Sequence, residues 1–77
     1  MSLSRKHYQA VADILKDERA TLDHLRTIYP AEPGTSLDQR RTGMALQIDR
    51  IEDHLCAYFK SDNPNFDPDR FRKAAQP

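Results

Sequence analysis

The segment from Tyr29 to Thr35 divides this chain into two halves, because no helix can continue through it. Pro30, Pro33 and Gly34 lie within five residues of one another. A proline lacks the backbone N–H that a helix needs, and Pro30 also disfavours helical geometry at the residue before it. A long stretch without proline remains on each side. Because the connection is short, we expect two helices that lie antiparallel.

The first stretch repeats apolar side chains at steps of three and four residues, the period of a helix buried along one face. We expect a helix over about residues 5–29, with Ser4 as its N-cap. Ile14 and Ile28 widen the apolar stripe on one side, which suits a helix with more than one neighbour. The stripe itself consists of Tyr8, Val11, Leu15, Leu22, Leu25 and Tyr29.

The second stretch has the same period after a loop at residues 30–36. We expect a helix over about residues 37–61, with Ser36 at its start and Gln39 at the position that completes a capping box. Its stripe consists of Leu37, Met44, Ile48, Ile51, Leu55 and Tyr58, with Phe59 beside it. The two stripes are predicted to face each other.

The segment Asp62–Phe71 has the features of a helix start. Asp67 can act as N-cap, and Pro68 then lies where a missing N–H costs nothing. Phe66 precedes the cap and Phe71 follows it by four residues, the spacing of a hydrophobic staple. We expect a helix over about residues 68–76, clipped over the open end of the hairpin by these four residues. The predicted fold is therefore an all-α single domain: an antiparallel helical hairpin with a short third helix.

A chain of 77 residues can bury only a modest core. With Cys56 as its one cysteine, it can form no intrachain disulfide and no cysteine-rich zinc site. Self-association is the remaining source of buried area, so we expect a homodimer of hairpins resembling a four-helix bundle. A lone cysteine without an apolar leader favours the cytoplasm. No apolar run is long enough to cross a membrane.

Some residues do not fit the pattern of the two apolar stripes, and these are candidates for a surface that binds a protein partner. Glu18 and Arg41 occupy positions where the period calls for an apolar residue. Either they extend to the edge of the hairpin, or they form a polar pair between subunits. Leu46 is predicted to point away from the stripe of its helix. The candidate partner surface is Ile14, Glu18, Ile28, Arg41 and Leu46.

Nucleic-acid binding is the alternative function. The chain has 12 Lys and Arg against 12 Asp and Glu, so its net charge does not steer it toward a polyanion. Basic residues nevertheless gather at the predicted open end, where they could contact phosphates, although aspartates are interleaved with them. The candidate contacts are Arg5, Lys6, Arg70, Arg72 and Lys73.

No pattern in the sequence indicates a catalytic, cofactor or metal site. The three histidines lack the spacing of three or four residues that a helix needs to present two metal ligands. Cys56 has no base positioned beside it and is expected to be a small core residue. The aspartates around Asp67 lack the glycine and glutamate of a calcium loop. We therefore expect a protein that is not an enzyme and that needs no cofactor or metal.

Both ends of the chain carry a family resemblance. Arg5-Lys6-His7-Tyr8 and the closing run Asp62-Asn63-Pro64-Asn65-Phe66-Asp67-Pro68-Asp69-Arg70-Phe71 resemble an "RKxY" opening and a "DNPxFDxxRF" ending. These motifs are similar to those of small uncharacterised proteins encoded by actinobacteriophages or prophages. The resemblance implies an intracellular protein that binds and modulates a host or phage protein. It implies no functional residues.

Overall fold

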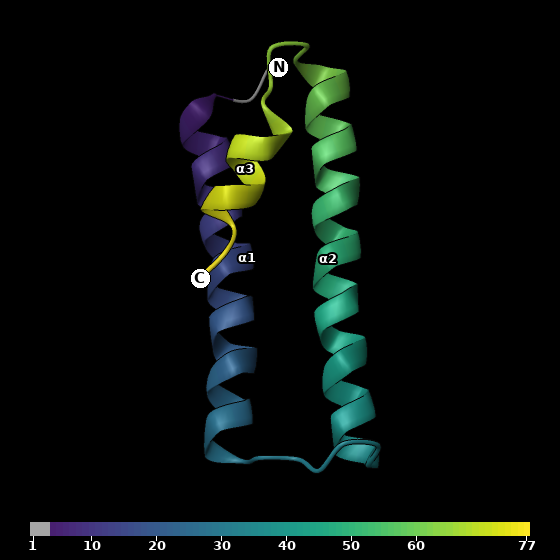
Figure 1. Ribbon diagram of the computed structural model, residues 1–77. Helices are drawn as coiled ribbons and strands as arrows, with labels where there is room; N and C mark the ends of the chain where they lie inside the picture. The colour runs from purple at the N-terminus through teal and green to yellow at the C-terminus, as the bar shows by residue number, and fades with distance from the viewer. Residues whose placement is uncertain (1–3) are drawn as a thin grey trace.

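Two long helices and one short helix make up the protein. The computed structural model describes residues 4–77. The helices are α1 (Arg5–Ile28), α2 (Ser36–Asp62) and α3 (Pro68–Ala74), and no strand occurs within the described range. α1 and α2 form an antiparallel hairpin, and α3 packs against them near the end that lies away from their connection, here called the open end (Figure 1). The expected all-α hairpin with a short third helix is confirmed.

Local signals set where the helices begin and end. α1 ends at Ile28, one residue before the expected end, and α3 ends at Ala74, two residues before it. Gly34 has a φ of 83°, a left-handed conformation that glycine adopts without a steric penalty. The predicted capping box of Ser36 and Gln39 is wrong. Thr35 is the N-cap of α2, and its hydroxyl oxygen accepts a hydrogen bond from the N–H of Asp38 at 3.3 Å.

α3 begins as the sequence predicted. The carboxylate of Asp67 accepts a hydrogen bond from the backbone N–H of Arg70 at 3.2 Å, and Pro68 is the first helical residue. The rings of Phe66 and Phe71 lie on either side of this cap with their centroids 5.7 Å apart. Both side chains are buried, so the expected clip over the open end is present.

The core is concentrated at the open end rather than along the whole hairpin. Four aromatic rings form its centre, with neighbouring centroids 4.9 to 5.7 Å apart in tilted or edge-to-face arrangements that favour aromatic pairs. Toward the connection, Leu22 is the one further apolar residue that is buried. The aromatic cluster consists of Tyr8, Phe59, Phe66 and Phe71, and the buried residues packed with it are Ala12, Leu15, Cys56 and Ala75.

The expectation that the two stripes face each other is only partly right for α2, because Ile48 and Leu55 pack against the core while the other stripe residues do not. Glu52 and Arg41 are buried, with 4% and 8% of their surfaces exposed, and they lie on the side of α2 that meets α1. The stripe residues Met44, Ile51 and Tyr58 are exposed instead. The buried side of α2 follows a second period of three and four residues, which runs through Arg41, Ala45, Ile48, Glu52, Leu55 and Phe59.

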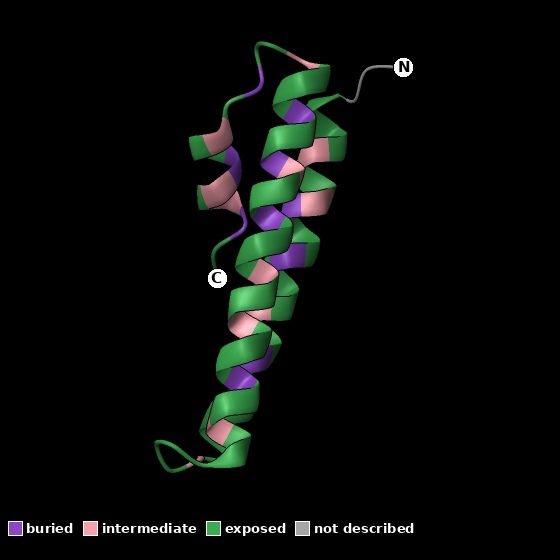
Figure 2. Ribbon diagram, turned by 90° about the vertical axis from the view of Figure 1, so that its right-hand side faces the viewer, coloured by how far each residue is buried: buried purple, intermediate pink, exposed green. Residues whose placement is uncertain are grey.

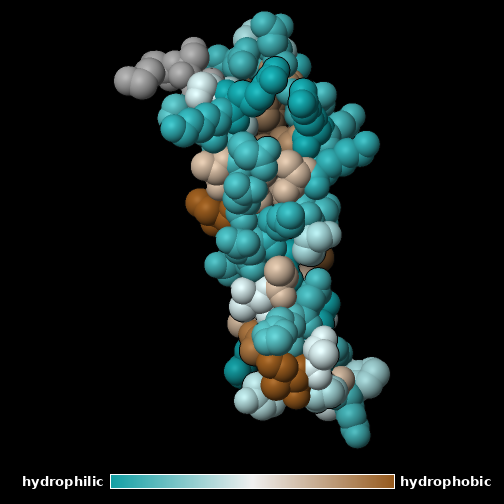
Figure 3. All heavy atoms as spheres, turned by 90° about the vertical axis from the view of Figure 1, so that its left-hand side faces the viewer, coloured by the Kyte–Doolittle hydropathy of each residue, from teal (hydrophilic) through white to brown (hydrophobic). Residues whose placement is uncertain are grey.

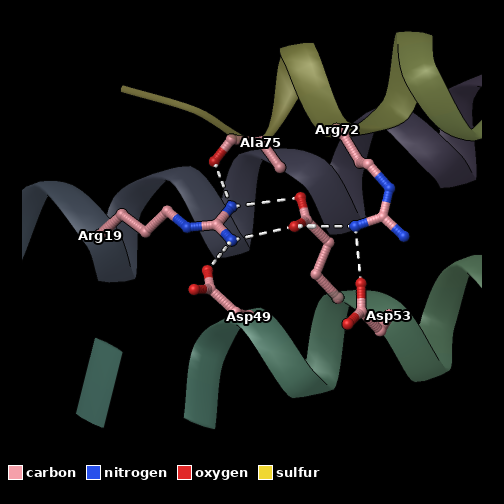
Figure 4. A network of polar contacts seen from close by, with 6 residues as sticks. Arg19, Asp49, Asp53, Arg72 and Ala75 are labelled. Carbon is pink, nitrogen blue, oxygen red and sulfur yellow. Dashed lines mark hydrogen bonds and ion pairs between the residues drawn. The ribbon is translucent and has the colours of Figure 1, made fainter. Parts of the chain in front are cut away.

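Glu52 is buried because two arginines neutralise it (Figure 4). Arg19 of α1 donates to both of its carboxylate oxygens, at 3.2 and 3.0 Å. Arg72 of α3 approaches the same carboxylate at 3.5 Å. Buried carboxylates are costly unless they are paired and hydrogen-bonded in this way. The network joins all three helices around one carboxylate.

Further contacts hold the two arginines of this network in place. Arg19 also contacts Asp49 at 2.8 Å and donates to the backbone carbonyl of Ala75 at 2.9 Å, while Arg72 contacts Asp53 at 2.7 Å. The hydrogen bond to Glu52 raises the pKa of Arg19 above its ordinary value, and the hydrogen bond to Asp53 raises the pKa of Arg72. Both guanidinium groups therefore stay charged.

Candidate interaction surface

α3 covers only one face of the hairpin. It meets α2 through Glu52 and Asp53, and Lys60 donates to the carbonyl of Phe66 at 3.2 Å. Seen along the edge of the hairpin, α3 stands to one side, and no helix of residues 4–77 covers the other (Figure 2). That uncovered side is called the bare face below.

The bare face carries a row of large apolar side chains from α2. Met44, Ile51 and Tyr58 are seven residues apart, which places them above one another on one helix surface. All three are exposed, Tyr58 to 63%. Half-buried Ile48 and Leu55 lie between this row and the core. The row therefore continues the hydrophobic core out to the surface.

α1 adds a second apolar row to the same face. Val11 is half-buried, while Ile14 and Leu25 are exposed. Glu18 lies seven residues after Val11 and seven before Leu25, so it stands in the middle of this row. Its carboxylate makes no ion pair or hydrogen bond with any residue from 4 to 77. The bare face is thus defined by Val11, Ile14, Glu18 and Leu25 of α1 with Leu37, Met44, Ile51 and Tyr58 of α2.

The molecule exposes more surface than a compact monomer of its size. Its accessible surface is 5834 Å², whereas a compact protein of 8.9 kDa exposes about 4,800 Å². Its radius of gyration is 14.6 Å, against about 11.5 Å for a compact chain of this length. Seen from the α1 side, hydrophobic atoms lie at the surface toward the connection, within a mainly hydrophilic exterior (Figure 3).

The predicted partner-surface residues do not form one patch. Ile14 and Glu18 lie on the bare face, and Ile28 lies at its edge, one turn beyond Leu25. Leu46 is exposed but follows Met44 by two residues, which turns it to the opposite side of α2.

Arg41 is a correction to the predicted partner surface. It is buried, and its guanidinium group donates a short hydrogen bond to the backbone carbonyl of Tyr29. A cation at this place stabilises the C-terminal end of α1, where backbone carbonyls lack helical partners. Arg41 therefore belongs to the fold and is not available to a partner.

The predicted nucleic-acid contacts are only partly free. Arg5, Lys6, Arg70 and Lys73 are exposed. Arg72, however, is bound to Glu52 and Asp53 within the chain. That part of the predicted basic surface is wrong, because these carboxylates already neutralise its charge.

Metal ligands, the cysteine and the helix lengths are the remaining features of the described chain that the sequence predictions concern. Among residues 4–77, no three His, Cys, Asp or Glu side chains come together in a way that could hold a metal ion. Cys56 is buried beside the aromatic cluster, and desolvation raises the pKa of its thiol. None of the helices in this range has the length and apolar character needed to span a membrane.

Sequence reasoning missed the true role of the α2 stripe. Met44, Ile51 and Tyr58 were expected in the core, because an apolar row on a helix normally turns inward. The second period on α2 is visible in the sequence, but what turns it inward is the contact of Glu52 with Arg19 of another helix, which the sequence pattern does not show.

No protein-family model, curated protein or solved structure matches this chain.

Proposed function

We propose that this protein is a non-enzymatic interaction module whose bare face is its protein-binding surface. The observation that carries the proposal is the exposed row of Met44, Ile51 and Tyr58, which runs along α2 beside a second row on α1. Contiguous apolar patches on small proteins mark interaction sites, whereas single exposed apolar residues do not.

The proposed occupant of this face is a second copy of the chain. A spacing of seven residues between apolar side chains is typical of helices that pack against other helices. Two hairpins joined at this face would form a four-helix bundle, with one α3 on each outer side. The net charge of the chain is zero, so two copies do not repel each other at long range.

The size of the face is suited to such a dimer. The molecule measures 45 × 19 × 18 Å, so one long face offers an area close to the roughly 800 Å² that a standard interface takes from each partner. The surface in excess of a compact monomer is of the same order. Covering the bare face would therefore give this small chain the buried area that its own core lacks.

The resemblance of the chain ends to small actinobacteriophage proteins supports a place for this module in the cytoplasm of an infected or lysogenic bacterium. A dimer of this kind would act by modulating a host or phage protein. The motif residues at the C-terminal end do not form the binding surface in this proposal, because Phe66, Asp67 and Phe71 hold α3 in place.

The test compares two exposed positions on opposite sides of α2. Sedimentation equilibrium should give the wild type twice its monomer mass of 8.9 kDa. Ile51→Glu should give a monomer with an unchanged helical circular dichroism spectrum, because it places a charge in the interface. Leu46→Glu is the matched control and should remain dimeric, since Leu46 lies away from the bare face.

Two results would contradict different parts of the proposal. The wild type could prove monomeric and capture a host or phage protein that Ile51→Glu does not capture. The bare face would then be the binding surface, but its partner would not be a second copy of the chain. If Ile51→Glu and Leu46→Glu behave alike in both measurements, the bare face is not the interaction surface.

A further inference from the structure

A second concave feature lies away from the bare face. A surface cavity of about 530 Å³ opens between the first turns of α1, the segment joining α2 to α3, and α3 itself. Its volume lies within the range of about 300 to 1,000 Å³ that is usual for small-molecule sites. Because it uses a different side of the molecule, it is independent of the proposed dimer.

The apolar part of this cavity is aromatic and held in place. Tyr8, Phe66 and Phe71 all line it. The centroids of the Tyr8 and Phe66 rings are 4.9 Å apart, and Phe66 and Phe71 are almost fully buried. Tyr8 is only half-buried, so its ring, held by Phe66 and Phe71, offers a preformed surface to a flat apolar group. Such groups pack against aromatic rings in offset or edge-to-face geometry.

The polar part of the cavity contains two arginine side chains that could bind a ligand. Arg5 and Arg70 line it, and neither guanidinium group is bound to another residue of the described chain, in contrast to Arg19, Arg41 and Arg72. Asp67 is the one carboxylate in the lining, and it caps α3. The charged side chains of the lining therefore sum to one positive charge, which favours a ligand with one negative charge.

The hydroxyl group of Tyr8 is a second sign of an absent partner. Its oxygen is buried and has no hydrogen-bond partner among residues 4–77. Buried hydroxyl groups nearly always have a partner, and an exception needs an explanation such as a bound molecule. The same residue contributes its ring to the cavity lining.

We propose that this cavity binds a small aromatic carboxylic acid. Its ring packs on Tyr8, which Phe66 and Phe71 hold in place, and its carboxylate is paired by the guanidinium groups of Arg5 and Arg70. Arginine is suited to this role because its planar fork of N–H donors matches a carboxylate.

The experiment titrates the ¹⁵N-labelled protein with 3-phenylpropionate and follows backbone amide shifts. Saturable shifts are expected at Tyr8, Phe66 and Arg70. The neutral amide 3-phenylpropionamide and the small anion acetate should each bind at least about tenfold more weakly, since each lacks one of the two recognised groups.

Variants then assign the charge. Arg5→Gln and Arg70→Gln should each weaken 3-phenylpropionate about tenfold, the value of one charge-assisted hydrogen bond. Arg40→Gln removes an exposed arginine of α2 outside the cavity and should leave the affinity unchanged. Tyr8→Phe should keep the fold, as judged by its melting temperature, and weaken 3-phenylpropionate binding, because the unpartnered hydroxyl group lies at the cavity.

Three outcomes would overturn the proposal. One is the absence of saturable shifts with 3-phenylpropionate at millimolar concentration. Another is equal binding of the acid and its amide, which would leave the arginines without a role. The third is a loss of affinity in Arg40→Gln equal to that in Arg5→Gln and Arg70→Gln, which would indicate attraction by the overall charge only.

Discussion

Arg19 of α1 and Glu52 of α2 form a two-pronged ion pair, with Nη1–Oε1 and Nη2–Oε2 distances of 3.2 and 3.0 Å. The side chain of Glu52 is 5% exposed and that of Arg19 is 11% exposed. The pair lies in the middle of the hairpin, where α2 would otherwise present an apolar surface. It therefore sets which side of α2 turns toward α1.

Replacing Glu52 by alanine should destabilise the fold strongly. The change leaves Arg19 buried without its main partner, a situation that costs about 3 to 5 kcal/mol. Asp49→Ala is the matched control, because Asp49 also contacts Arg19 but is 60% exposed, so its loss should cost less than about 1 kcal/mol. Urea unfolding followed by circular dichroism measures both values. Equal losses in the two variants would mean that the network does not depend on burial.

Truncating Phe71 should show how much of the stability comes from α3. Phe71→Ala is expected to lower the free energy of unfolding by about 3 kcal/mol or more, because the ring is buried in the aromatic cluster. Leu46→Ala removes an exposed apolar side chain and should change it by less than about 0.5 kcal/mol. A near-neutral Phe71→Ala would show that α3 is loosely attached.

The two glycines should respond to alanine in opposite directions. Gly43 lies inside α2, and an added Cβ would meet nothing within 4 Å, so Gly43→Ala should raise the free energy of unfolding by about 1 kcal/mol. Gly34 has a positive φ, so Gly34→Ala should lower it through backbone strain. Thermal and urea unfolding measure both. Destabilisation by Gly43→Ala would indicate that a neighbouring chain packs closely at this point of α2.

Glu18 should oppose the proposed dimer. It stands between Val11 and Leu25 in the α1 row without an ion-pair partner in the described chain, so dimerisation would remove an unpaired carboxylate from water at a cost. Glu18→Leu is therefore expected to lower the dimer dissociation constant, and sedimentation equilibrium over a dilution series measures the shift. Glu32→Leu, at an exposed position in the connection, is the control. No difference between the two variants would place Glu18 outside the interface.

Cys56 should make the stability depend on pH in alkaline solution. Desolvation raises the pKa of its thiol in the folded chain, so the unfolded chain loses this proton first as the pH rises. Its contribution to stability is complete below the pKa of the unfolded thiol and is lost as the pH rises through the folded value. The wild type should therefore lose more free energy of unfolding than Cys56→Ala between neutral and alkaline pH. Parallel curves for the two proteins would contradict this.

The same burial should protect the thiol chemically. The reagent DTNB attacks thiolates, which are disfavoured at this site. Labelling of Cys56 should therefore be much slower in the folded protein than in urea at the same pH.

The helices were predictable because their signals are local. Pro30, Pro33 and Gly34 interrupt any helix regardless of its surroundings, and Asp67 with Pro68 starts one. Phe66 and Phe71 could be assigned to a clip for the same reason, since the staple depends on residues that are neighbours in the sequence.

The orientation of α2 was not predictable from local pattern. The row through Met44, Ile51 and Tyr58 consists of apolar residues, whereas the other side of α2 contains the charged residues Arg41 and Glu52. The second side turns inward because partners come from distant segments: Arg19 and Arg72 for Glu52, and the carbonyl of Tyr29 for Arg41. Choosing between two faces of a helix requires knowing these partners, which periodicity does not contain.

The position of the core at the open end determines where this small domain tolerates insertions and deletions. Chain termini are usually among the places where a domain tolerates truncation best. Here Tyr8, Phe71 and Ala75 hold the fold together, whereas the segment between Pro30 and Gly34 is far from the aromatic cluster. An inserted peptide or a new pair of chain ends is therefore best placed in that bend, whereas a deletion that reaches Tyr8 or Phe71 would remove part of the aromatic cluster.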